Sequence, residues 1–344
     1  MTNRNALVFS VVGLGLIAGG LLFRSNGVKA AKHEGKQGSV AAASVAPYFP
    51  PGAIWNQDIS HAAVDPNSDK IIATLDKLGG WGARGKMQVD WSLRVMQANA
   101  STPRVPFHLG GGEADTDNAA TFPLPPGGGI EGLTDYHCPN GGDCHLLVAD
   151  RPEGKLYEVY QANYANGTLY GNFLTIWDLN RVYPPSGRGD QCSSSDAAGF
   201  PIAALLFNAD ELAAGSINHA IRFILPNDRI RAHVFVHPAT HAGGPSGPGS
   251  APPYGAHFRL KASFDMDQLT PAAQVVARAM QKYGMFLADG GNMALTAQSD
   301  ADTVTKYEDL GFDTHSLFPL KVTDFEVLDL GKPIPLTYKC VRNP

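Results

Sequence analysis

Charged residues are scarce in this sequence, at 17% of its 344 positions, and 27 lysines and arginines face 32 acidic residues. Proteins that bind nucleic acids in general need an excess of positive charge, because the phosphate backbone dominates the affinity. This composition therefore argues against nucleic acid as a partner.

Long segments without chain breakers are also missing, since the chain contains 38 glycines and 25 prolines. That density excludes a long helical bundle or coiled coil. The glycine-rich runs at 109–113 and 127–129 do not link a strand to a helix. A phosphate loop, a dinucleotide fingerprint and a nucleophile elbow all require such a link, so none is expected. No cofactor and no bound metal are assigned from the sequence.

The N-terminus has a long apolar run. Residues 6–23 carry no charge and follow Arg4, which predicts an export signal or an uncleaved anchor within residues 1–30. Residues 31–46 are small and polar, as in a linker, and residues 47–344 are expected to form a single β-rich domain. We therefore expect an extracellular, periplasmic or cell-surface protein, whose contact with a membrane is limited to the N-terminal segment.

The four cysteines form an even number, which suits an oxidising compartment. Cys138 and Cys144 flank a turn, and their pairing would leave Cys192 to bond Cys340. A zinc site made by these first two cysteines with His137 and His145 is the alternative, although adjacent ligands on an extended chain point to opposite sides.

Six segments rich in branched and aromatic residues predict strands, and their close spacing favours a mainly β fold, an antiparallel sandwich of jelly-roll type with accessory helices. These segments are 144–150, 155–162, 172–179, 217–225, 229–237 and 256–264. Helices are expected over 68–78 with Ser68 as cap, after the capping box that starts at Asn208, and from Pro271 to Tyr283 with Thr270 as cap.

Several stretches together resemble a family of exported bacterial proteins of uncharacterised function. They are 54–72 (IWNQDISHAAVDPNSDKII), 146–160 (LLVADRPEGKLYEVY), 176–180 (IWDLN), 192–202 (CSSSDAAGFPI), 209–223 (ADELAAGSINHAIRF), 258–265 (FRLKASFD) and 280–292 (MQKYGMFLADGGN). Members of that family sometimes carry carbohydrate-binding modules. The resemblance implies an extracellular role connected with glycans, and it carries no catalytic residues over to this chain.

The charge balance reverses between His219 and Lys261, where five basic residues and five histidines accompany Asp228 as the single acid. If the three predicted strands of this span are neighbours, side-chain alternation brings their polar residues to one face. That face would gather Arg222, Arg231, His233, His237, His257, Arg259 and Lys261. Such a surface predicts a site for an anionic ligand, although outward-facing basic residues on a sheet are ordinary.

This predicted face leads to the first functional hypothesis, a lyase that cleaves an acidic polysaccharide by β-elimination. Arg222, Arg231, His257, Arg259 and Lys261 would bind the substrate and neutralise its carboxylates. His233, His237 or Tyr254 would then act as base or acid.

Two further hypotheses use other residues. A glycoside hydrolase would need two carboxyls, for which Asp196 and Asp289 are the candidates, with Asp178 a further acid-base candidate, although aspartates often serve only in turns. A non-catalytic carbohydrate-binding or surface-interaction module would use Trp177 or Tyr254 for stacking, and burial of both would count against it.

Three further sets of residues are candidates for metal binding or for a structural role. A metal held by His233 and His237 with His241 or His257 is conceivable, as is calcium in the loop with Glu113, Asp115, Asp117 and Asn118. His219 lies on the apolar side of its predicted strand and is expected to be a buried, hydrogen-bonded histidine.

Overall fold

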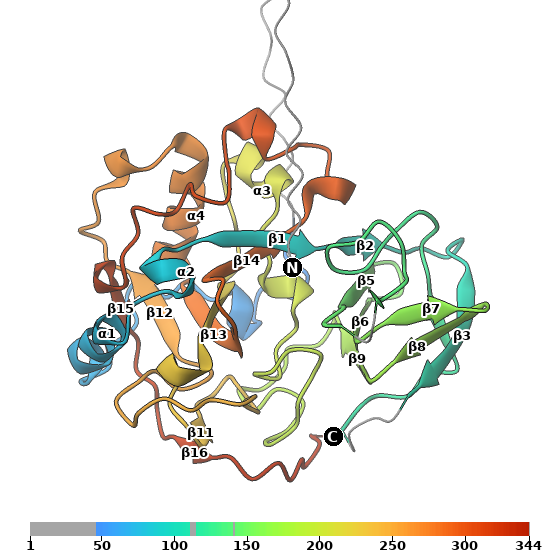
Figure 1. Cartoon of the computed structure of the whole chain (residues 1–344), viewed down its shortest axis with the longest axis horizontal. Helices are drawn as coiled ribbons and strands as arrows, with labels where there is room; N and C mark the ends of the chain where they lie inside the picture. Colours follow the sequence, from blue (N-terminus) through green and yellow to red (C-terminus); the bar gives the residue numbers. More distant parts are fainter. Residues whose placement is uncertain (1–45, 111–114, 140–141, 344) are drawn as a thin grey trace, which may run out of the picture. The chain divides into compact units, whose positions relative to one another are not determined.

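The computed structural model describes residues 46–110, 115–139 and 142–343 (Figure 1). The predicted export signal, and the predicted linker up to residue 45, lie outside the described residues. Among the helices of the described part, none combines the length and the apolar character needed to cross a membrane.

The largest sheet has six strands in the order β1-β14-β10-β13-β12-β15. Their bounds are β1 Val89–Leu93, β10 Ile221–Leu225, β12 His257–Leu260, β13 Met285–Gly290, β14 Leu295–Gln298 and β15 Phe325–Val327. The pairs β1 with β14 and β10 with β13 are parallel, and the other pairs are antiparallel.

Two four-stranded sheets lie on the right in Figure 1. One has the order β2-β5-β6-β9, with β2 Val95–Gln97, β5 Leu146–Asp150, β6 Lys155–Tyr160 and β9 Phe173–Asp178. The other has the order β4-β3-β8-β7, with β3 Arg104–Leu109, β4 Thr121–Pro123, β7 Asn163–Ala165 and β8 Thr168–Gly171. A fourth, two-stranded sheet joins β11 (Val234–Phe235) to β16 (Ile334–Pro335).

The fold is strand-rich, as predicted, with 25% strand against 18% helix, but it is a mixed α/β fold whose four sheets are not closed. Parallel pairs occur in three of these sheets, which corrects the expected antiparallel sandwich. Close spacing along the chain suggested hairpins, but parallel neighbours require long crossover connections. The chain from β10 to β13 includes β12 and a helix before it returns beside β10.

The predicted helices are present, as α1 (Ser68–Lys77), α3 (Ala209–Ala214) and α4 (Pro271–Lys282), with a short α2 (Gly82–Gly85) in addition. The capping box at Asn208 and the Thr270 cap are confirmed. Ser68 is not the cap of α1, because it is the first helical residue and its Oγ accepts a hydrogen bond from the backbone N–H of Val327. Short 3-10 turns occupy Ile54–Asn56, Ala203–Leu205, Asn227–Arg229, Met266–Gln268, Asp300–Asp302, Glu308–Leu310 and Val322–Asp324.

The sheet that contains β5, β6 and β9 separates two hydrophobic cores. Leu147 and Leu156 pack into the larger core around the six-stranded sheet, while Val148 and Tyr157 pack into the smaller core toward the β4-β3-β8-β7 sheet. All five residues of β5 are buried for this reason, and the four residues before Asp150 are apolar instead of alternating with polar ones.

Buried polar groups fasten the loop of residues 193–203 to this middle sheet. The Ser195 backbone N–H donates to Thr175 Oγ1 at 3.1 Å, and Ser195 Oγ donates to the carbonyl of Glu158 at 2.9 Å. Glu158 itself accepts the backbone N–H of Ala203 at 2.9 Å, and burial raises the pKa of Glu158 to about 7. These contacts attach the loop that carries Asp196 to the sheet.

Both predicted disulfides are present. Cys138 bonds Cys144 across the expected turn, and Cys192 bonds Cys340 and so joins the C-terminal segment to the loop before Asp196. The disulfides agree with an oxidising compartment outside the cytoplasm.

Candidate functional site

A cavity of about 310 Å³ opens between the six-stranded sheet and the β2-β5-β6-β9 sheet. Its walls come from the start of β5, the end of β6, the start of β9, the loop before Ala198, the loop after Thr240, and β13. The lining residues are Asp143, His145, Tyr160, Phe173, Ser193, Ser194, Ser195, Asp196, Ala197, His241, Gly243 and Asp289. Nine of these twelve residues have polar side chains.

Asp289 and Asp196 both contact the guanidinium of Arg222. The Arg222 Nη2 lies 2.5 Å from Asp196 Oδ1 and 3.6 Å from Asp289 Oδ2. Arg222 Nη1 donates to Thr296 Oγ1 at 3.0 Å, whereas the buried Nε has no partner. Three residues singled out from the sequence, Arg222, Asp196 and Asp289, thus meet at one point.

A β-bulge brings Asp289 to this point. In the parallel pairing of β10 with β13, Phe223 faces Leu287 but Ile224 faces Asp289, so Ala288 is skipped. The extra residue moves Asp289 to the sheet face that carries Arg222, because cross-strand partners share a face. The carbonyl of the bulged Ala288 accepts the backbone N–H of Ala198 at 2.9 Å, which ties the Asp196 loop to β13.

The two carboxyls differ in access to solvent. The Asp196 side chain is fully buried, whereas the Asp289 side chain is 32% exposed. Burial, reinforced by the negative charge of Asp196, raises the pKa of Asp289 to about 6. Asp289 can therefore exchange a proton with a bound molecule near neutral pH, whereas Asp196 holds Arg222 in place.

His145 lies on the wall of the cavity between two hydrogen-bond acceptors. Its Nδ1 is 2.7 Å from Glu131 Oε2, and its Nε2 is 3.0 Å from the carbonyl oxygen of Ser195. Both ring nitrogens must donate in this arrangement, which requires the charged imidazolium. Burial opposes this charge, but the hydrogen bond to Glu131 and its negative charge outweigh burial and raise the pKa of His145 to about 9.

Tyr160 and Tyr254 complete the surroundings of Asp289. Tyr160 lies in the cavity wall near both Asp143 and Asp289, whose charges together with burial raise its pKa. Tyr254 is completely buried, and burial raises its pKa far above the ordinary value, so Tyr254 stays a neutral phenol beside the acids.

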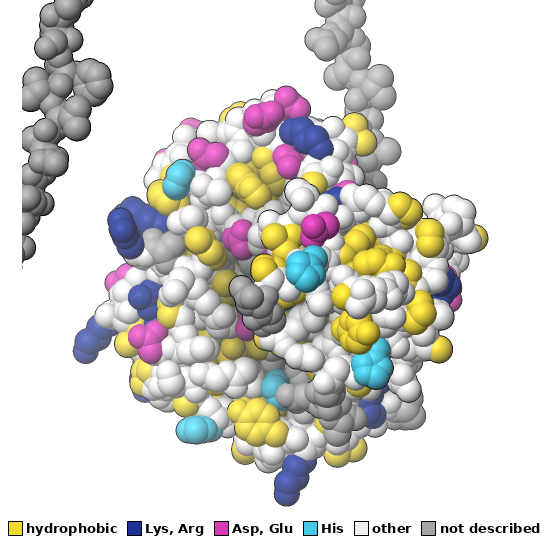
Figure 2. All heavy atoms as spheres, turned by 45° about the vertical axis from the view of Figure 1, so that its right-hand side comes forward, with side chains coloured by type: hydrophobic (Ala, Val, Ile, Leu, Met, Phe, Trp, Pro, Cys, Tyr) yellow, Lys and Arg dark blue, Asp and Glu magenta, His cyan; other side chains and the backbone are white. Residues whose placement is uncertain are grey.

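The predicted cationic face does not exist in the structure. β10 and β12 are separated by β13, and β11 belongs to a different sheet. The sequence predicts a strand over 229–237, but only Val234–Phe235 forms one, and Pro238 and a positive φ at His233 border it. On the face drawn in Figure 2, most lysine and arginine side chains lie toward the margins of the view.

The other predicted binding residues have local partners instead. Arg259 pairs with Glu326 at 2.7 Å, and the Nζ of Lys261 donates to the carbonyl of Thr323 at 2.9 Å. His257 stacks on Phe286, and burial lowers the pKa of His257 to about 4. These groups support the fold around β12 and do not reach the cavity.

The remaining predicted residues lie elsewhere. Exposed His233 and half-buried Arg231 precede β11, and the Nε2 of His237 contacts Asp190 Oδ1 at 2.8 Å. Exposed Asp178 accepts the backbone N–H of Asn180, as expected of a turn former. His219 is buried with its Nε2 3.2 Å from Glu211, as predicted.

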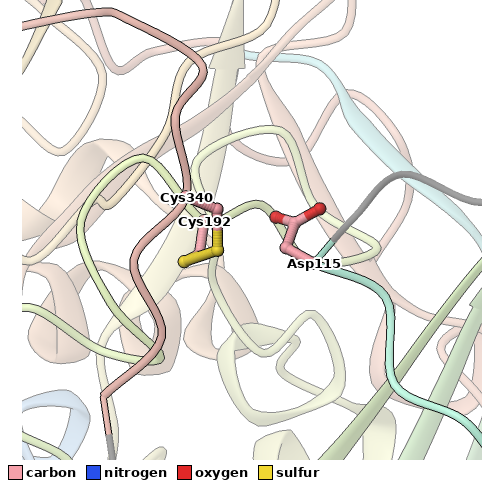
Figure 3. A group of neighbouring side chains, drawn as sticks. All are labelled: Asp115, Cys192 and Cys340. Atoms are coloured by element: carbon pink, nitrogen blue, oxygen red, sulfur yellow. A yellow bond between two sulfur atoms is a disulfide. The ribbon is translucent and has the colours of Figure 1, made fainter.

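In the predicted zinc and calcium sites, ligand groups are engaged with other residues of the protein. Cys138 and Cys144 are bonded to each other, which removes the thiolates of the alternative zinc site. Figure 3 shows Asp115 beside the Cys192–Cys340 disulfide, where the sulfurs are likewise bonded and no thiolate is available. Asp117 of the proposed calcium loop pairs with Arg342 at 2.6 Å and Arg188 at 3.0 Å, while Glu113 lies outside the described residues.

Sequence reasoning missed the roles of His145, Glu131 and Asp143. His145 was considered only as a partner of Cys144, and Glu131 precedes it by 14 residues without a shared pattern. The sequence has no pattern that links these residues, because the geometry of the disulfide turn brings them together.

Comparison with known proteins gives no further assignment: no protein-family model matches the sequence, and neither a curated protein nor a solved structure matches it.

Proposed function

We propose that this protein is an exported hydrolase that uses Asp289 as a proton donor to break a bond in an extracellular glycan. The observation that carries this proposal is the partly exposed Asp289 carboxyl in the cavity, whose pKa is raised to about 6 beside the buried Asp196–Arg222 pair. The glycan as substrate class rests on the family resemblance of the sequence.

The chemistry of glycoside hydrolysis fits this carboxyl. A general acid must hold its proton near neutral pH and give it to the leaving oxygen as the glycosidic bond breaks. Glycosidases commonly raise the pKa of that acid by burial and a neighbouring negative charge, which are the two causes acting on Asp289. The group that activates water is expected on the wall that carries Asp143 and His145.

The polar lining of the cavity suits a polar sugar. Three aspartates, Asp143, Asp196 and Asp289, lie in its wall together with the imidazolium of His145. The charge of Arg222 is balanced by buried Asp196. A volume of about 310 Å³ is at the lower end for ligand pockets, so the end of a glycan chain fits better than a long internal stretch.

The two other hypotheses have less support. The lyase mechanism needed Arg259 and Lys261 beside the bases His233 and His237, and these residues are apart. The binding-module hypothesis needed an accessible ring at Trp177 or Tyr254, but these side chains are 1% and 0% exposed.

The test is incubation of the disulfide-intact protein with a panel of neutral and acidic polysaccharides and oligosaccharides, followed by mass spectrometry. Hydrolysis adds one water across the broken bond, whereas β-elimination leaves an unsaturated product without added water. We expect products of the first kind, released from chain ends. If all products are unsaturated, the lyase hypothesis replaces this proposal. If no glycan gives a product, the proposal is rejected.

A further inference from the structure

Glu131, Asp143 and His145 bring three ligand atoms together at the edge of the cavity. One atom from each side chain lies within 4.8 Å of the other two. Nδ1 of His145 is 2.7 Å from Glu131 Oε2 and 3.6 Å from Asp143 Oδ1. Ligands around a tetrahedral zinc ion at bonds of about 2.0–2.1 Å are about 3.3 Å apart, so small shifts would accommodate an ion.

The orientation of the imidazole is fixed from outside the cluster. The carbonyl oxygen of Ser195 can only accept, so Nε2 of His145 carries a hydrogen and donates it. The other nitrogen, Nδ1, then faces the two carboxylates. A backbone carbonyl that holds the far N–H of a histidine is the usual outer partner of a metal-ligating imidazole.

Charge provides a second argument. Two carboxylates converge on one nitrogen, and the single proton on Nδ1 satisfies only the nearer one. The imidazolium with both carboxylates leaves one net negative charge, whereas a divalent cation with neutral His145 and the same carboxylates gives a neutral set. A divalent ion therefore balances this cluster better than the proton does.

The fold holds Glu131 in place. Ser92 Oγ donates to Glu131 Oε1 at 3.2 Å, and the Glu131 backbone N–H donates to the His145 carbonyl at 3.0 Å. The other carboxylate oxygen, Oε2, faces His145 Nδ1. Asp143 belongs to the loop closed by the Cys138–Cys144 disulfide. Glu131 and His145 are largely buried, whereas the Asp143 side chain is 74% exposed and opens toward the cavity.

We propose that Glu131, Asp143 and His145 bind one divalent transition-metal ion, for which zinc is the best fit. One imidazole and two carboxylates suit zinc, whereas calcium and magnesium prefer oxygen ligands alone. Asp143 and His145 line the cavity, so a fourth position of the ion faces the space beside Asp289. The metal site does not depend on the proposed hydrolysis.

The test is isothermal titration of the chelator-treated, disulfide-intact protein with zinc chloride, together with titration by cobalt(II) followed by its visible absorption. We expect one ion per chain. Asp143→Asn removes an exposed ligand without disturbing the core, and it should weaken zinc binding at least about tenfold. His145→Gln should abolish the cobalt spectrum of the bound ion.

The matched control is His137→Gln, which changes an exposed histidine directly before the disulfide loop. This variant should bind zinc as the unchanged protein does. Circular dichroism and thermal unfolding of each variant show whether it is folded. Absence of binding at millimolar zinc, or unchanged binding in folded Asp143→Asn and His145→Gln, would overturn the assignment.

Discussion

The Asp289→Asn variant is expected to lose activity on the glycan by about a thousandfold in kcat/KM, because a positioned general acid contributes about 10²–10⁴ to the rate. Asparagine keeps the size of the side chain but cannot donate the proton of a carboxylic acid. The loss should appear in kcat, since the leaving oxygen takes up its proton in the transition state. The measurement is steady-state kinetics with the glycan that gives product in the panel.

The matched control is Asp76→Asn, which makes the same chemical change at an exposed position of α1. Its kinetics should equal those of the unchanged protein. A substrate with a good leaving group, which needs little protonation, should restore much of the rate to Asp289→Asn. Full activity of Asp289→Asn on the natural glycan would show that the proton comes from another group.

Arg222→Met is expected to lower the free energy of unfolding by about 3–5 kcal/mol, because it leaves the carboxylate of Asp196 buried without its cation. The side chain of Asp196 is fully buried, so water cannot replace the guanidinium. Asp289 is less affected, since part of its carboxyl is in contact with solvent. Urea unfolding followed by circular dichroism measures this change.

Two companion variants separate the buried charge from general damage. Arg222→Met with Asp196→Asn removes both charges, and it should recover a large part of the lost stability. Arg104→Met breaks a pair in which Arg104 is 3.7 Å from Glu153 and both side chains are exposed, so it should cost less than about 1 kcal/mol. A double variant as unstable as Arg222→Met alone would contradict the role given to Asp196.

Local patterns in the sequence were sufficient for several elements. The capping box at Asn208 and the Thr270-Pro271 start of α4 are satisfied by neighbouring residues alone, so short-range chemistry determines them. The disulfides followed from four cysteines and one short turn. Burial of His219 followed from side-chain alternation in a strand pattern.

The arrangement of the strands depended on long-range packing that the sequence did not reveal. Alternation placed Arg222 and Arg259 on the polar sides of their segments, but both are buried, each against a carboxylate that comes from a distant part of the chain. Side-chain alternation assigns an arginine to the solvent-facing side of a strand because it carries no information about a distant acidic partner. Asp196 lies 26 residues before Arg222, and the bulge at Ala288 that brings in Asp289 has no mark in the sequence.

The site was therefore predicted in part. Asp196, Asp289 and Arg222 were each singled out, but under different hypotheses, and only the fold joins them at one cavity. His145 needed the disulfide turn and the Ser195 carbonyl to acquire its place in the wall.

Titration of the Asp289 carboxyl by carbon-13 NMR is the most direct measurement, with the resonance assigned by its absence in Asp289→Asn. The carboxyl should titrate at a pKa of about 6, so that it keeps a proton in mildly acidic solution and loses it as the pH passes through 6. An ordinary aspartate value of about 4 would show that the cavity does not hold a proton on Asp289, and would contradict its role as the acid.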